Sequence, residues 1–191
     1  MNCLSRHCSR LVAVGSLMGT LFVSGAAAQA QTCPSFPITL SAQMLGSLPT
    51  NTVITDIVAG DNFSWLSWTG DQSDRTLVVS LTVPGDSTNY VNPDDSTDHE
   101  LNVGDWVMAK APVSNRSSMR AALNSLLGVD LIVPVFDDVR GSGSSAAYHV
   151  AGFAHVQLLD YSLPSQNRIS ILFLGAVDCS GGGGGDGGPN V

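Results

Sequence analysis

Few side chains in this sequence are of the types that carry acid–base or metal chemistry. Beyond residue 30 it contains three histidines, His99, His149 and His155. His149 and His155 lie in one segment with strand character, at a separation that would put their side chains roughly 20 Å apart, too far to share a metal ion. The motifs HExxH, CxxC and GxSxG are absent, as is a phosphate-binding glycine loop. We therefore predict no catalytic residue, no metal centre and no cofactor.

Carboxylates gather most densely in the polar segment 84–100. Four of them lie close together at its end: Asp94, Asp95, Asp98 and Glu100. Calcium binds several such oxygens, but the spacing here does not match the EF-hand loop, and the turn glycine of that loop is missing. We interpret the segment as a solvated loop and keep calcium binding by these four carboxylates as the alternative.

Aromatic side chains concentrate between Gly60 and Asp71. In an extended chain Phe63 and Trp65 would share one face, and Trp68 would point away unless a bulge intervened. Aromatic rings on one face can stack on a sugar, but large rings more often belong to the hydrophobic core or cover its edge. Phe63, Trp65 and Trp68 therefore define one alternative function, that of a secreted carbohydrate-binding protein.

The clearest element that could position functional side chains is an amphipathic helix over residues 115–127. Apolar side chains recur along one of its faces at helical spacing: Met119, Ala122, Leu123, Leu126 and Leu127. Ser114 or Asn115 is expected to cap its start, and Gly128 to end it in the left-handed conformation. No other segment beyond residue 30 repeats this pattern, so one main helix packed on a sheet is expected.

Two arginines lie in the first turn of this helix. Arg116 and Arg120 place positive charge where the helix dipole disfavours cations. One interpretation is that both are solvated near acidic loops. The other is that they form a site for the carboxylates of a binding partner.

The rest of the chain has the composition and alternation of β-strands. Strands are expected over residues 36–42, 53–59, 75–83, 129–137, 146–159 and 167–177, with a shorter one near 105–107. The segment 75–83 also fits a helix. Pro134 cannot donate to a sheet, so its strand should lie at an edge or carry a bulge there. These elements predict an α+β, mostly β fold: a curled, antiparallel, barrel-like sheet with one helix packed on it.

Residues 1–30 have the pattern of a cleavable signal peptide. Two arginines precede an apolar run, and Ala28-Gln29-Ala30 forms the cleavage site. Residues 31–180 are expected to form a single globular domain, and residues 181–191 a disordered glycine-rich tail. The protein is therefore predicted to be exported to the periplasm, the cell surface or the medium, with no membrane span after signal cleavage.

The net charge limits the kinds of partner that the protein can bind, and the cysteines indicate a disulfide. All sixteen acidic residues, but only six of the eight basic ones, lie beyond residue 30. The resulting net charge, near −10, disfavours nucleic acid as a partner.

Two of the four cysteines, Cys33 and Cys179, lie beyond residue 30, one near each end of that part of the chain. In an exported chain they are expected to form one disulfide, with a nucleophilic cysteine or an intermolecular bridge as the alternatives.

Several motifs occur in the same order as in a known family. They are CPSFPITL, GDNFSWLSW, LNVGDWV, VSNRSSMRAALNSLLG, VDLIVPVFD, GSGSSAAYHVAGFAHVQLLDY and the ending CSGGGGG. In these motifs the chain resembles the C-terminal region of TadG-like proteins, which belong to the Flp (tight-adherence) pilus-assembly group of bacterial envelopes. The resemblance covers nearly all of the chain beyond residue 30 and includes no catalytic signature. TadG-like proteins typically begin with a membrane anchor and often carry a von Willebrand A-type domain, whereas a cleavable signal is expected here.

The resemblance implies an exported, envelope-associated protein that takes part in pilus assembly or surface adhesion. Together with the lack of catalytic motifs, it predicts a non-enzymatic module whose partners are envelope or pilus proteins. Two alternatives are less favoured. One is the carbohydrate-binding protein, and the other is a secreted hydrolase whose site is assembled from dispersed histidines and aspartates.

Overall fold

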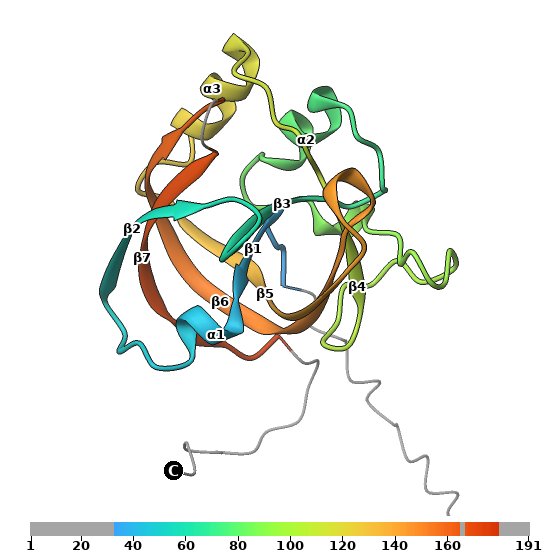
Figure 1. The fold of residues 1–191 in the computed structure, drawn as a ribbon, viewed down its shortest axis with the longest axis horizontal. Coiled ribbons are helices and arrows are strands. Elements are labelled where there is room, and N and C mark those ends of the chain that lie inside the picture. Colours follow the sequence, from blue (N-terminus) through green and yellow to red (C-terminus); the bar gives the residue numbers. More distant parts are fainter. Residues whose placement is uncertain (1–32, 165–166, 180–191) are drawn as a thin grey trace, which may run out of the picture.

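The computed structural model describes residues 33–164 and 167–179 (Figure 1). The predicted signal peptide, residues 1–30, and the predicted tail, residues 181–191, lie outside the described residues. The strands are β1 (Ile38–Ser41), β2 (Thr52–Val58), β3 (Phe63–Ser67), β4 (Trp106–Ala109), β5 (Asp130–Arg140), β6 (Ala147–Ser162) and β7 (Arg168–Val177). The helices are α1 (Ala42–Leu45), α2 (Asp74–Ser80) and α3 (Ser117–Asn124), with the 3-10 turns η1 (Ser87–Asn89) and η2 (Gly143–Ser145). In this described part, no helix is long and apolar enough to cross a membrane.

The strands form one curled sheet that closes on itself. Their order is β2-β7-β6-β4-β3-β1-β5, and an additional pairing of β5 with β6 turns part of the sheet into a ring. The ring runs β5, β1, β3, β4, β6 and back to β5, and Figure 1 shows these strands wound around a common centre. The predicted mostly β, barrel-like fold is confirmed. The sheet is mixed rather than purely antiparallel, because β1 and β5 run parallel.

β6 belongs to two parts of the sheet at once. Residues 147–149 pair with β4, whereas from Phe153 onwards β6 pairs with β7, and β2 follows on β7. β5 pairs with β6 along the other edge, with register shifts on either side of Phe136 that bend the ladder. Pro134 itself pairs in register with Phe153, and the first shift follows Val135, so the bulge lies close to the proline but not at it. β5 is not an edge strand, however, because β1 also pairs with it.

Two hydrophobic clusters form the core. The larger one lies between the sheet and α3 and includes Trp65, Met119 and Leu123. The smaller one contains Trp68 and Tyr90, together with residues of β4, β5 and β6. Burying a large apolar side chain contributes roughly 1.5–3 kcal/mol to folding, so these clusters are the main source of stability.

The predicted helix is present as α3, but it begins differently. Arg116 is its N-cap residue and makes no side-chain cap hydrogen bond. The two predicted caps bond elsewhere: the hydroxyl of Ser114 donates to Asp74, and the side chain of Asn115 accepts from Arg120. The first turn of α3 therefore lacks the side-chain acceptor that usually stabilises a helix start.

α3 also ends earlier than predicted. After Asn124 the chain continues as turns, although Leu126 remains fully buried and extends the apolar face beyond the helix. Gly128 adopts the expected positive φ, 73°, but its N–H donates to the carbonyl oxygen of Leu158 in the sheet. The apolar spacing predicted the buried positions Met119, Leu123 and Leu126 correctly, but Leu127 is 40% exposed, and the helix boundaries were predicted less well.

The segment 75–83, expected as a strand with a helix as the alternative, forms most of α2. The hydroxyl oxygen of Ser73 accepts from a backbone N–H of the first turn, where Asp74 adds a favourable negative charge. Leu77 and Leu81 share one face and are buried in the core. Capping and packing here override the strand propensity of the valines. α2 therefore accompanies the predicted helix as a second helix, of seven residues against the eight of α3.

The predicted disulfide between Cys33 and Cys179 is present. The two Cα atoms are 5.6 Å apart, and the cysteines are separated by 146 residues in sequence. The bond fastens the segment before β1 to the segment after β7. It therefore joins the two ends of the described chain.

Candidate functional site

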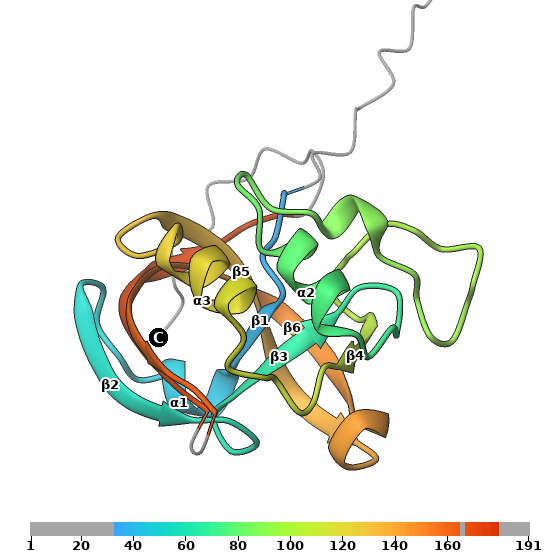
Figure 2. The same cartoon turned by 90° about the horizontal axis from the view of Figure 1, so that it is seen from above.

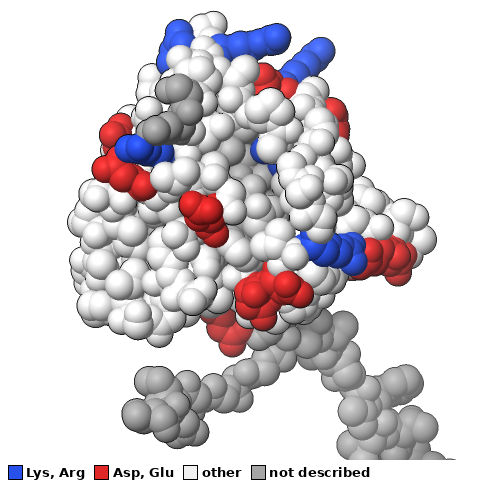
Figure 3. All heavy atoms as spheres, viewed as in Figure 1, with Lys and Arg blue, Asp and Glu red and all other residues white. Residues whose placement is uncertain are grey.

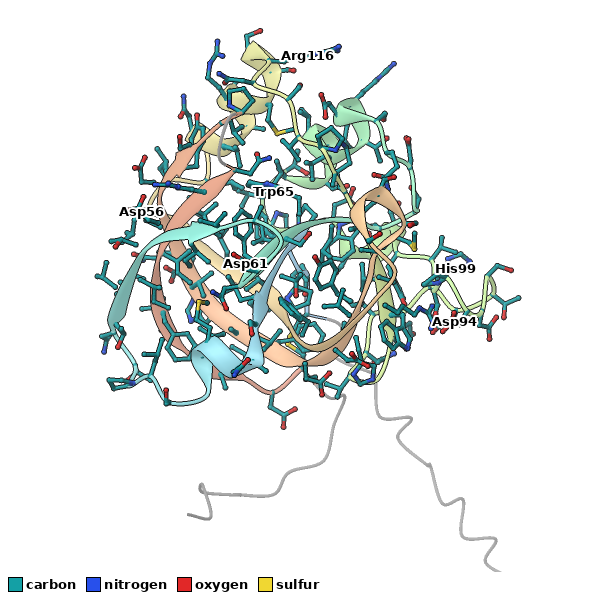
Figure 4. The ribbon with its side chains drawn as sticks, viewed as in Figure 1. Asp56, Asp61, Trp65, Asp94, His99 and Arg116 are labelled. Atoms are coloured by element: carbon teal, nitrogen blue, oxygen red, sulfur yellow. A yellow bond between two sulfur atoms is a disulfide. The ribbon has the colours of Figure 1, made fainter. Side chains whose placement is uncertain are left out.

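The three candidate aromatic residues lie in the core rather than on the surface. Phe63 is 0% exposed, Trp65 2% and Trp68 1%. The rings of Phe63 and Trp65 pack edge to face, with centroids 5.6 Å apart, and Figure 4 shows Trp65 inside the ring of strands. No ring face is free to stack on a sugar at these exposures. Their assignment as binding residues is corrected to one as core residues, because large apolar surfaces gain most by leaving water.

The two candidate arginines lie on the surface, and a third joins them. Arg116 and Arg120 of the α3 region and Arg75 of α2 are all exposed. Figure 2 shows α2 and α3 side by side, and Figure 3 shows blue side chains gathered over that end of the molecule. Arg120 donates to the backbone and side chain of Asn115. Within the described chain, no carboxylate forms an ion pair with any of the three arginines.

A buried ion pair supports this end of the molecule. Lys110, directly after β4, is 2% exposed, and its Nζ lies 3.1 Å from Oδ1 of Asp74 at the start of α2. The same ammonium group donates to the carbonyl oxygen of Pro112 at 2.5 Å. The other carboxylate oxygen of Asp74 accepts from the hydroxyl of Ser114, just before α3. The pair therefore joins β4, α2 and the segment that leads into α3.

Hydrogen bonds keep the carboxylates near the start of α2 ionised. Burial alone raises the pKa of Asp74, but hydrogen bonds from Ser114 and Lys110 outweigh burial and hold this pKa below its ordinary value. The pKa of Asp71 is also lowered, chiefly by the hydrogen bond from Thr76. Charge-assisted hydrogen bonds of this kind are stronger than neutral ones. They fix the orientation of α2 and therefore the position of the arginine that it carries.

A cleft of about 520 Å³ lies between α2 and the segment before α3. We call it the arginine cleft. The residues that define it here are Ser73, Arg75, Lys110, Val113, Ser114 and Arg116. Because Asp74 already neutralises Lys110, the cations available to a ligand in the cleft are Arg75 and Arg116.

A second cavity, of about 610 Å³, adjoins the arginine cleft. Lys110, Pro112 and Val113 line both hollows. Trp65 and Asn167 also line the second cavity, and the indole N–H of Trp65 and Oδ1 of Asn167 are buried without a hydrogen-bond partner among the described residues. The two hollows thus meet at Lys110, and the second contains these two polar groups.

The histidines form pairs with carboxylates rather than a catalytic triad. Nδ1 of His149 lies 2.6 Å from Oδ1 of Asp137, and Nε2 of His155 lies 3.4 Å from Oδ2 of Asp130. Neither histidine lines the arginine cleft or the adjoining cavity. In the described chain, no hydroxyl group hydrogen-bonds to either ring, so a nucleophile is missing from both pairs.

In the polar segment 84–100, which we call the acidic loop, several carboxylates accept hydrogen bonds from other residues of the chain. Asp94 accepts from both terminal nitrogens of Arg140, and the hydrogen bond lowers the pKa of this carboxyl group. Asp95 accepts from Thr97, which also lowers its pKa, and Asp98 accepts from a neighbouring asparagine. Among residues 33–164 and 167–179, no three carboxylate, histidine or cysteine side chains are placed to hold a metal ion.

Sequence reasoning missed Arg75, Asp74 and Lys110 as parts of the site. The only signal was that Lys110 is the one lysine beyond residue 30, next to alanines in an apolar stretch. Its partner lies thirty-six residues earlier, and no spacing rule connects two such positions.

Comparison with known proteins adds no relative to this description. No protein-family model, no curated protein and no solved structure matches the chain. The resemblance to TadG-like proteins therefore stays a prediction that rests on the ordered motifs.

Proposed function

We propose that this chain is a non-enzymatic, exported module of the bacterial envelope or surface that binds another envelope component, as in Flp pilus assembly or adhesion. The observation that carries the proposal is the group of three exposed arginines beside a cleft, which have no carboxylate partner among the residues that the structure describes. This group stands out because the chain beyond residue 30 has a net charge near −10. An acidic protein that leaves half of its few cations unpaired at one end presents them to a partner.

The start of α3 supports the proposal. Arg116 stands at the N-cap position, where Ser, Thr, Asp or Asn would stabilise the helix, and Arg120 lies in the first turn, where the dipole disfavours a cation. Local choices that oppose stability are found mainly at functional sites. The two arginines are therefore better explained by binding than by folding.

Neither alternative function has an observation in its favour. The aromatic residues that would stack on a sugar are buried, and within residues 33–164 and 167–179 no hydroxyl hydrogen-bonds to His149 or His155, which pair with aspartates. The envelope-binding proposal uses residues that are exposed and unpaired.

The test is a crosslinked pull-down of the tagged full-length chain from envelopes of its own host, read by mass spectrometry, together with a deletion strain. We expect a pilus-assembly or other envelope protein to be enriched over a tag-only control, and the deletion strain to lose piliation or adhesion. A deletion strain with normal piliation, adhesion and envelope integrity would refute the proposal.

A further inference from the structure

We propose that the arginine cleft binds an acidic segment of a partner protein, whose carboxylates pair with Arg75 and Arg116. This inference rests on the proposed function, because it names the surface and the chemistry of the partner that the module binds. It commits to a carboxylate-bearing polypeptide rather than to an anionic membrane, an anionic polysaccharide or a second copy of the chain.

The charges of the described residues select a carboxylate partner. Lys110, Arg140 and Arg168 each have an aspartate partner within the chain, at 3.1, 2.5 and 3.3 Å respectively. Arg75 and Arg116 have none, and both line the same hollow. A guanidinium group presents a planar fork of donors that matches a carboxylate in two parallel hydrogen bonds. Two such groups in one cleft favour a ligand with more than one carboxylate.

The form of the cleft favours a peptide over a membrane or a polysaccharide. The cleft is a hollow, and beside the arginines its lining includes the exposed, apolar Pro112 and two serines, Ser73 and Ser114, whose hydroxyls already donate to aspartates. A peptide segment has side chains and backbone groups that suit such a mixture. An extended anionic surface or polymer would also face the negative charge of the rest of the molecule, which repels it over about 10 Å at moderate salt.

The acidic loop of a second copy is a poor ligand for the cleft. Its carboxylates at Asp94, Asp95 and Asp98 already accept hydrogen bonds within their own chain. Releasing Asp94 would also leave Arg140 without its ion-pair partner. A partner whose carboxylates are free before binding avoids this cost.

The cleft is fixed before the ligand arrives. The ion pair of Lys110 with Asp74 and the hydrogen bond from Ser114 tie α2 to the segment before α3, so the bases of the two arginines are held at a constant spacing. Only the arginine side chains need to be ordered on binding, which limits the entropic cost. Figure 4 shows Arg116 at the outer end of α3, within reach of a ligand that approaches from solvent.

The probe is a labelled synthetic peptide of alternating glutamate and alanine, and the readout is fluorescence anisotropy with the purified full chain. We expect saturable binding that weakens between about 0.05 and about 0.5 M salt, and no binding of the same peptide with glutamine for glutamate. Arg75→Gln and Arg116→Gln should each weaken binding roughly three- to fivefold, and the double variant about tenfold or more. Arg168→Gln, which removes the same charge outside the cleft, is the matched control and should bind as the unaltered chain does.

Three further measurements test the other possible ligands of the cleft. The first is binding to vesicles that contain phosphatidylglycerol, and the second is binding to polygalacturonate. The third is sedimentation of the chain alone across a concentration series, which detects binding of a second copy. Peptide binding that Arg75→Gln and Arg116→Gln leave unchanged would overturn the inference. So would binding to vesicles, to polygalacturonate or to a second copy that these substitutions weaken while the peptide does not bind.

The same variants keep this inference separable from the proposed function. If the unaltered chain and the double variant capture the same envelope protein equally well, the envelope function stands and the arginine cleft is not its site. If neither the chain nor its variants capture an envelope protein and the deletion strain is normal, the proposed function fails, whatever the peptide does.

Discussion

Lys110 is the residue at which the cleft depends most on a single interaction. Its ammonium group is buried, and among the residues that the structure describes, Asp74 has the only carboxylate within ion-pair distance of it. A buried charge that loses its partner costs far more than the pair itself contributes, because the remaining group cannot regain its hydration. The energetic role of the pair is therefore visible only when each partner is removed singly and then both together.

Lys110→Met should lower the free energy of unfolding at neutral pH by about 3 kcal/mol, because Asp74 then keeps its charge without the ammonium group. The double variant Asp74→Asn with Lys110→Met should lose clearly less free energy of unfolding than the two single variants lose in sum. Urea unfolding of the unaltered chain, the two single variants and the double variant measures this coupling. Additive losses would show that the two side chains do not stabilise the fold as a pair.

The cost of Lys110→Met should also depend on pH. The pKa of Asp74 is below its ordinary value of 3.8 in the folded chain, so the unfolded chain binds the proton more readily. The stabilisation is then complete above about pH 4 and is lost as the pH falls through the folded-state value. The difference between Lys110→Met and the unaltered chain should accordingly shrink below pH 4.

Individual residues differ in how far the sequence could predict their roles. The Cys33–Cys179 disulfide was predictable, because in an exported chain two remaining cysteines have one obvious arrangement. Arg116 and Arg120 stood out, because their charge opposes the dipole of a helix that the apolar spacing had already predicted. Lys110 did not, because the feature that matters is its distance from Asp74, which only the fold determines.

Among the elements, α3 offers the sharpest test, because we propose that the residue at its N-cap position serves binding, and this residue does not cap the helix. Arg116→Asp should raise the free energy of unfolding by about 0.5–1 kcal/mol, since aspartate supplies the missing cap acceptor and a favourable charge. The same change should abolish binding of the acidic peptide. Urea unfolding and anisotropy on one protein sample measure both effects.

Arg116→Asn is the control for this prediction, because asparagine caps a helix without adding negative charge. It should stabilise α3 to a similar extent and weaken peptide binding only as much as Arg116→Gln does. A loss of stability in both variants would mean that Arg116 has a structural role that the cap position does not reveal.

The elements were predictable where their pattern is local. The spacing of Met119 and Leu123 gave the buried face of α3, and alternation gave β2, β5, β6 and β7 to within a few residues. The sequence did not decide whether α2 is a strand or a helix, because its valines favour a strand while Ser73 and the spacing of two leucines favour a helix. The structure decides between these preferences by burying the leucines in the core.

For the whole molecule, the disulfide gives the most direct prediction. Cys33→Ser combined with Cys179→Ser, or reduction of the unaltered chain, should lower the melting temperature by roughly 10 °C, because the unfolded chain regains the freedom of a very long loop. Calorimetry under oxidising and reducing conditions measures the shift. An unchanged melting temperature would show that the bond does not contribute to stability.

The fold class followed from composition and alternation, but the closure of the sheet did not. The ring depends on the parallel pairing of Leu40 and Ser41 in β1 with Val135 and Phe136 in β5, which are far apart in sequence. No local pattern specifies such a contact. It arises because β1 is buried on both faces and must satisfy its backbone between two neighbours.

The double membership of β6 has a consequence for how the molecule opens. The ring and the outer strands β7 and β2 share this one strand, and β5 pairs along most of it. β6 itself cannot leave its place without opening both parts, whereas β7 and β2 can leave the ring by breaking their pairing with β6. Amide hydrogens in the middle of β6 should therefore be among the slowest to exchange with solvent, because their release opens both parts of the sheet together, whereas β2, at the outer edge, can open alone.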